Sequence, residues 1–99
     1  MAVADADIAL ATDLFSDLGN ISTRKMFGGI CLYLDGVVFA LMTRDAQLFL
    51  KAKGDVATRL AEDGASRFHN MPYWSLPLSA LDDPSEACTL ARRTIASLT

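Results

Sequence analysis

The sequence predicts a single α+β domain over residues 1–99, a two-layer antiparallel sheet with helices in the order α-β-β-β-α-β-β-α. Two observations carry this prediction. Between residues 21 and 53, three apolar runs are separated by short polar turns, which is typical of an antiparallel meander. Near both ends, apolar residues recur at helical spacing instead. With 99 residues, 52% of them hydrophobic, the chain can bury a substantial core.

The first helix is expected over residues 4–18. Its apolar positions fall on one helical face and comprise Ile8, Ala11, Leu14, Phe15 and Leu18. Aspartates gather near its start, where negative charge suits the helix dipole. Gly19 follows the last turn and is placed to end the helix.

The meander is expected to contain three strands, over Arg24–Leu34, Val37–Thr43 and Gln47–Ala52. Asp35-Gly36 predicts a two-residue hairpin turn, since glycine accepts positive φ without a Cβ clash. Gly28-Gly29 indicates a bulge or a close backbone approach.

Strict alternation in the second of these strands places Val37, Phe39 and Leu41 on one face. It places Val38, Ala40 and Met42 on the other. Both rows are apolar, and three short helices are not expected to cover both. We therefore expect a symmetric homodimer through the row of Val38, Ala40 and Met42.

A second helix is expected over about residues 55–63, with Asp55 as N-cap and Gly64 as the stop. Two short strands, Arg67–Asn70 and Tyr73–Leu76, are expected to follow, with a turn at Pro72 between them.

The last helix is expected over residues 83–98. Asp83 as N-cap, Pro84 at the first helical position and Glu86 at the third form a capping-box pattern. Its inward face consists of Ala87, Leu90, Ala91, Ile95 and Leu98.

The sequence shows no convincing catalytic, cofactor or metal site. His69 is the single histidine, and Cys31 and Cys88 lack metal-ligand spacing, so buried reduced thiols are expected. Gly28-Gly29 lacks the spacing of a dinucleotide loop. An enzyme or a small-ligand binder would need Arg24, Lys25, Tyr33, Tyr73 and His69 to converge. No membrane-length apolar run or signal pattern is present, so we expect a cytoplasmic protein.

Charge is unevenly distributed along the chain. The net charge is −3, yet residues 21–53 carry five basic residues against two acidic ones. If Arg24 and Lys51 lie on the first and third strands, about 10 Å, or two sheet spacings, separates them. We therefore expect no useful affinity for duplex DNA, which requires several cations on one surface.

Four blocks along the chain resemble a known family, namely Arg24-Lys25-Met26-Phe27-Gly28-Gly29, Leu32-Tyr33-Leu34-Asp35-Gly36, Leu48-Phe49-Leu50-Lys51 and Met71-Pro72-Tyr73-Trp74-Ser75, the last followed by Pro77. In order and spacing they are similar to the N-terminal domain of the TfoX/Sxy competence regulators. The resemblance covers nearly the whole chain and implies the same α+β fold.

The resemblance implies a role in transcription regulation. The two-domain regulators act with the cyclic-AMP receptor protein to turn on DNA-uptake genes, and nothing in this sequence corresponds to their C-terminal domain. We therefore expect a stand-alone, non-enzymatic protein-interaction module whose partner belongs to the transcription machinery. A self-associating structural domain and a small-ligand binder or enzyme remain as alternatives. The expected partner contacts are Arg24, Lys25, Lys51, Lys53, Tyr73 and Trp74.

Overall fold

A computed structural model describes residues 4–26 and 28–98 of the chain. It contains one sheet in which every strand pairs antiparallel with its neighbour, in the order β1-β2-β3-β4-β5. The strands are β1 (Ile21–Met26), β2 (Gly29–Leu34), β3 (Val37–Met42), β4 (Leu48–Lys51) and β5 (Tyr73–Ser75). The helices are α1 (Asp5–Leu14), the 3-10 turn η1 (Ser16–Leu18), α2 (Gly54–Glu62), α3 (Leu78–Leu81) and α4 (Pro84–Ala96).

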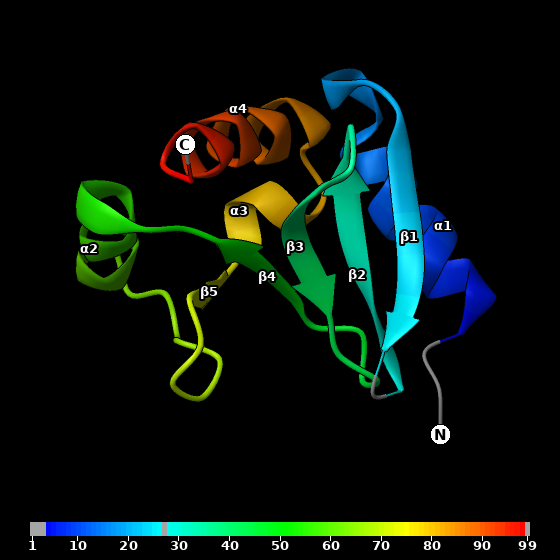
Figure 1. Cartoon of the computed structure of the whole chain (residues 1–99), viewed down its shortest axis with the longest axis horizontal. Coiled ribbons are helices and arrows are strands. Elements are labelled where there is room, and N and C mark those ends of the chain that lie inside the picture. The colour runs from blue at the N-terminus through cyan, green and yellow to red at the C-terminus, as the bar shows by residue number, and fades with distance from the viewer. Residues whose placement is uncertain (1–3, 27, 99) are drawn as a thin grey trace.

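Helices α1, α3 and α4 form a second layer on one face of the sheet, while α2 lies beyond the β4–β5 side (Figure 1). Residues paired across neighbouring strands share a face, so the register identifies this face as the one that carries Leu32, Ala40 and Leu50. In the part of the chain that the structure describes, no helix is long and apolar enough to cross a membrane.

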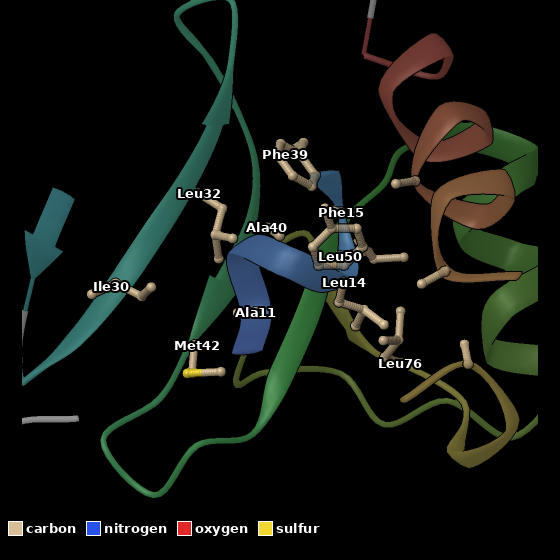
Figure 2. Packing of buried hydrophobic residues seen from close by; sticks show 13 residues of the cluster. Ala11, Leu14, Phe15, Ile30, Leu32, Phe39, Ala40, Met42, Leu50 and Leu76 are labelled. Atoms are coloured by element: carbon tan, nitrogen blue, oxygen red, sulfur yellow. The ribbon is translucent and has the colours of Figure 1, made fainter. Parts of the chain in front are cut away.

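The core lies between this face and the helices (Figure 2). The first helix and its C-cap contribute Ala11, Leu14 and Phe15 to the core. The sheet residues in the same cluster are Ile30, Leu32, Ala40, Met42 and Leu50. Phe15 meets Phe39 edge to face, with ring centroids 5.3 Å apart and planes at 86°. Such a pair contributes about 0.5–1.5 kcal/mol beyond its buried area.

The predicted fold class is confirmed: the chain is an α+β domain with a five-stranded antiparallel sheet. Strands β3, β4 and β5 agree with prediction within one residue at each end. The Asp35-Gly36 turn is also confirmed, with φ of 51° and 84° at its two central residues.

The single strand expected over Arg24–Leu34 is instead a hairpin of two strands, β1 and β2. Its connection contains Gly28 at φ 83°, so this glycine turns the chain back on itself. The other connecting residue, Phe27, lies outside the described residues. As a result, four strands precede α2.

The strand expected over Arg67–Asn70 is wrong. Only Arg67 forms a bridge, to Trp74, and His69 has φ 53°, which strand geometry does not allow. The side chain of Arg67 instead donates hydrogen bonds from Nε to the Met71 carbonyl (3.0 Å) and from Nη2 to the Asn70 carbonyl (3.3 Å). These bonds hold the segment in a tight loop.

The face assignment within β3 is also wrong, because a β-bulge interrupts the alternation. Leu32 pairs with Ala40 and Tyr33 with Val38, so Phe39 has no residue opposite it. Phe39, Ala40 and Met42 therefore all point into the core and are at most 4% exposed. The apolar row expected to form a dimer is covered by the chain's own helices at two of its three positions.

The helices differ from prediction at their ends. The first helix ends at Leu14 and continues as η1 rather than running to residue 18. Lys53, rather than Asp55, occupies the N-cap of α2, without a side-chain cap. Asp83 is confirmed as the N-cap of α4, accepting from the backbone N–H groups of Ser85 (3.1 Å) and Glu86 (3.3 Å). Helix α3 was not predicted.

The reciprocal half of the predicted capping box is absent. The Glu86 carboxylate accepts a hydrogen bond from the Ser79 hydroxyl at 3.0 Å, which ties α4 to the preceding helix α3. The backbone N–H of Asp83 is bonded to the Ala80 carbonyl instead.

Candidate functional site

The face of the sheet that points away from α1, α3 and α4 is the candidate site. The strand register places one row across it, from Arg24 through Cys31, Leu41 and Phe49 to Ser75. Period-two alternation adds a second group of residues to the same face, namely Met26, Tyr33, Lys51 and Tyr73. We call this surface the open face.

A hollow of about 480 Å³ lies on the open face. Its walls come from the ends of β1, β2 and β3, the β3–β4 turn and the loop before β5. They comprise Met26, Gly29, Ile30, Cys31, Leu41, Met42, Thr43, Arg44, Asp45, Gln47, Phe68, His69, Met71 and Tyr73. Most of these side chains are apolar or sulfur-containing, and the Cys31 Sγ lies 3.9 Å from the Met26 Sδ.

The loop of residues 67–72 forms one wall of this hollow. Phe68 packs on Phe49 of the open face, with ring centroids 5.1 Å apart, and the His69 ring lies 4.5 Å from that of Phe68. The Arg67 guanidinium at the start of the loop lies over the Trp74 ring, 5.4 Å from the ring centre. Beyond the single bridge between Arg67 and Trp74, the wall is thus held by ring packing and by the hydrogen bonds of the Arg67 side chain.

Burial disfavours the ionised form of two side chains that line the hollow, Cys31 and Tyr73. Burial raises the pKa of the Cys31 thiol, and nearby Lys51 only partly opposes this effect. Burial also raises the pKa of Tyr73, and the neighbouring Cys31 and Tyr33 add to the shift. Cys31 is therefore a weak nucleophile at neutral pH, and Tyr73 remains protonated.

The residues considered for an enzyme do not converge. His69 and Tyr73 both line the hollow, but Arg24 is not among the lining residues. Within residues 4–26 and 28–98, no group of three or more His, Cys, Asp or Glu could hold a metal ion.

The structure separates the six expected contact residues. Arg24, Lys51 and Tyr73 share the open face, where Tyr73 is only 7% exposed. Lys25 and Trp74 point to the opposite face, because they pair with the core residues Ile30 and Leu50.

Lys53 lies outside the sheet, at the N-terminus of α2, where its backbone N–H donates to the Ser97 hydroxyl at 3.1 Å. The spacing expected between Arg24 and Lys51 also changes, since both β2 and β3 lie between their strands. Three sheet spacings, about 14 Å, separate their strands, and Lys51 is offset along β4 by two further residues from Phe49, which is in register with Arg24.

Sequence reasoning missed the sulfur-containing residues of the hollow. Met26 and Met71 are 41% and 45% exposed, which is unusual for a large apolar side chain. They are far apart in the chain but line the same hollow, Met26 at the end of β1 and Met71 from the 67–72 loop. The one available signal was that both methionines fall within the family blocks.

Comparison with known proteins identifies the family. The sequence model of the TfoX N-terminal domain matches residues 13–98. The DNA transformation protein TfoX1 of Aliivibrio fischeri (strain ATCC 700601 / ES114) is 37% identical over 54 residues. These residues are 54% of this chain and 25% of that relative, so the match spans a quarter of the relative's length. The chain belongs to the family of TfoX N-terminal domains.

Proposed function

We propose that this domain is a non-enzymatic protein-interaction module in transcription regulation, and that the open face is its docking surface. Membership of the TfoX N-terminal domain family supports the regulatory role, as does the similarity to a protein named for DNA transformation. The expected partner is a component of the transcription machinery, of which the cyclic-AMP receptor protein is the first candidate.

The observation that carries the proposal is the hollow of about 480 Å³ on the sheet face opposite to α1, α3 and α4. Helices α1, α3 and α4 pack on the other face, while Phe68 of the 67–72 loop packs on Phe49 of the open face. Cys31, Phe49 and Tyr73 of the open face are at most 8% exposed. Partly exposed apolar side chains remain around the hollow, among them Leu41, Met26 and Met71. Exposed apolar side chains that gather around a hollow are typical of an interaction site.

Self-association remains a prediction, with a different surface from the one expected. Ala40 and Met42 are buried in the chain's own core, so the expected row cannot form the interface, and the open face is the candidate surface for a homodimer. A homodimer through this face would bring together two surfaces that each carry Arg24 and Lys51. Like charges at an interface oppose association, which favours a different partner.

The test is a titration of the purified domain against purified cyclic-AMP receptor protein and against RNA polymerase, followed by isothermal calorimetry. Met71→Asn removes an exposed apolar group from the hollow, and Leu10→Asn removes one of similar size, 67% exposed, from α1. We expect saturable binding that Met71→Asn weakens and Leu10→Asn leaves unchanged.

Absence of binding to both proteins would refute this choice of partner. Equal binding by the two variants would refute the open face as the docking surface. Thermal melts of both variants provide the folding control.

A further inference from the structure

Three cations lie at the hollow or on the same sheet face. Arg44 is one of its lining residues, and Arg24 and Lys51 lie on the same open face. None of the three has an ion-pair partner within residues 4–26 and 28–98. The one carboxylate at the hollow, Asp45, already accepts a hydrogen bond from the Thr43 hydroxyl.

Most acidic residues lie elsewhere in the molecule. The acidic residues of α1, η1 and α2 and of the start of α4 belong to the helices or to the turns beside them, away from the open face. A domain of net charge −3 thus has a locally positive surface around an apolar hollow. Fields of this kind concentrate partners of opposite charge and orient them.

The two exposed methionines determine what the hollow can accept. Met26 and Met71 both line it, and they are 41% and 45% exposed. The thioether side chain is flexible and polarisable, and therefore adapts to apolar groups of different shapes. Apolar side chains of a partner fit this environment better than a phosphate or a sugar does.

We propose that the open face binds an acidic segment of a partner protein, with a bulky apolar side chain of that segment seated between Met26 and Met71. This inference rests on the proposed function of the open face and adds the chemistry of the partner. Arg24, Arg44 and Lys51 face the carboxylates of the segment. Nucleic acid fits less well, because the strands of Arg24 and Lys51 are about 14 Å apart and the surface between them is apolar.

Fluorescence anisotropy with three matched peptide probes tests this inference. The first is a short labelled peptide in which aspartates flank two phenylalanines. The second replaces each aspartate by lysine, and the third replaces each phenylalanine by serine. We expect the full chain to bind the first peptide, to bind the other two at least about tenfold more weakly, and to lose affinity as salt rises.

Neighbouring residues on β1 provide a matched pair of variants. Arg24→Glu and Lys25→Glu make the same change in charge at adjacent positions, but only Arg24 points to the open face. We expect Arg24→Glu to weaken binding of the acidic peptide by at least about threefold and Lys25→Glu to leave it nearly unchanged. Met71→Ser should weaken binding as well, whereas Leu10→Ser on α1 should not.

Several outcomes would overturn the inference. These are equal binding of the acidic and basic peptides, equal effects of Arg24→Glu and Lys25→Glu, and the absence of binding by the acidic peptide. Binding of a labelled DNA duplex that competes with the peptide would overturn it too, as would a homodimer that masks the open face. Salt-insensitive binding of a whole protein at the open face, unaffected by Arg24→Glu, would leave the proposed function intact while refuting its acidic partner.

Discussion

Gly29→Ala is expected to destabilise the domain strongly, although the site is in a strand and its φ is not in the left-handed region. A Cβ at this position would lie 2.1 Å from the Met42 carbonyl oxygen, and 3.2 Å from the carbonyl carbons of Met42 and Thr43. These are backbone atoms of β3 and the residue after it, and they cannot rotate out of the way. The strands β2 and β3 must therefore separate by about 1 Å at this end to restore contact distances.

The magnitude follows from the opposing contributions. Overpacking of this kind costs about 1–3 kcal/mol, and one weakened ladder hydrogen bond costs about 0.5–1.5 kcal/mol. Alanine also lowers the conformational entropy of the unfolded chain, which stabilises the folded state by about 0.4–1 kcal/mol. Together these contributions give a net loss of about 0.5–4 kcal/mol in the free energy of unfolding, with a central value of about 2 kcal/mol.

Urea unfolding followed by circular dichroism measures this loss. With an m value near 1 kcal/mol/M, at the low end for small domains, the urea midpoint should fall by about 2 M. Gly36→Ala is the control: nothing lies within 4 Å of its Cβ, but its φ of +84° costs roughly 1 kcal/mol. If Gly29→Ala unfolds at the wild-type midpoint, or is more stable than Gly36→Ala, the close approach of β2 and β3 is wrong.

Three further predictions concern a helix cap, a thiol and DNA. Asp83→Ala should lower the stability by ~0.5–2 kcal/mol in thermal or urea melts, because two backbone N–H groups lose their acceptor; an unchanged midpoint would contradict the cap. In a Cys88→Ala background, the rate of Cys31 alkylation should have its pH midpoint above that of a free cysteine, because burial raises the Cys31 pKa. Lys51→Met should raise this midpoint further, since Lys51 lowers the Cys31 pKa. A midpoint unmoved by Lys51→Met would refute the coupling between the two side chains. A labelled DNA duplex should bind weakly at low and physiological salt in anisotropy titrations; tight, salt-sensitive binding lost on Arg24→Ala would refute this expectation.

Local signals in the sequence were sufficient for most of the sheet. Asp35-Gly36 determined the β2–β3 hairpin, because both residues adopt positive φ and few other dipeptides do so easily. Strand β1 was harder to predict. Its residues Ser22, Thr23, Arg24 and Lys25 are polar on both faces and show no apolar alternation, so only Gly28 could mark where the chain turns.

A glycine pair before an apolar run fits a bulge in one long strand and a turn between two strands equally well, since both need its conformational freedom. The choice depends on whether the polar segment before it finds a partner strand. That pairing is a tertiary contact, with Arg24 opposite Cys31 and Ile21 opposite Leu34. Local propensity does not encode it.

The candidate site was only partly predictable for the same reason. Side-chain alternation along a strand is enough to place Arg24 and Lys25 on opposite faces, which the structure confirms. The distance from Arg24 to Lys51, however, depends on how many strands lie between them, and it lengthened when one predicted strand became two. The wall of the hollow was not predictable either, because Arg67 holds the loop through its side chain rather than through a strand ladder.

The bulge at Phe39 determines which surface a partner can reach. With strict alternation, Phe39 would share a face with Leu41, and Ala40 and Met42 would point away from the helices. The extra residue rotates the strand, so that Phe39 packs edge to face on Phe15 and Ala40 and Met42 complete the core. Leu41 alone is left to continue the row between Cys31 and Phe49. A bulge stabilised by a contact with a residue 24 positions earlier in the chain has no local sequence signal. It is the bulge that leaves Leu41, rather than Ala40 and Met42, on the open face.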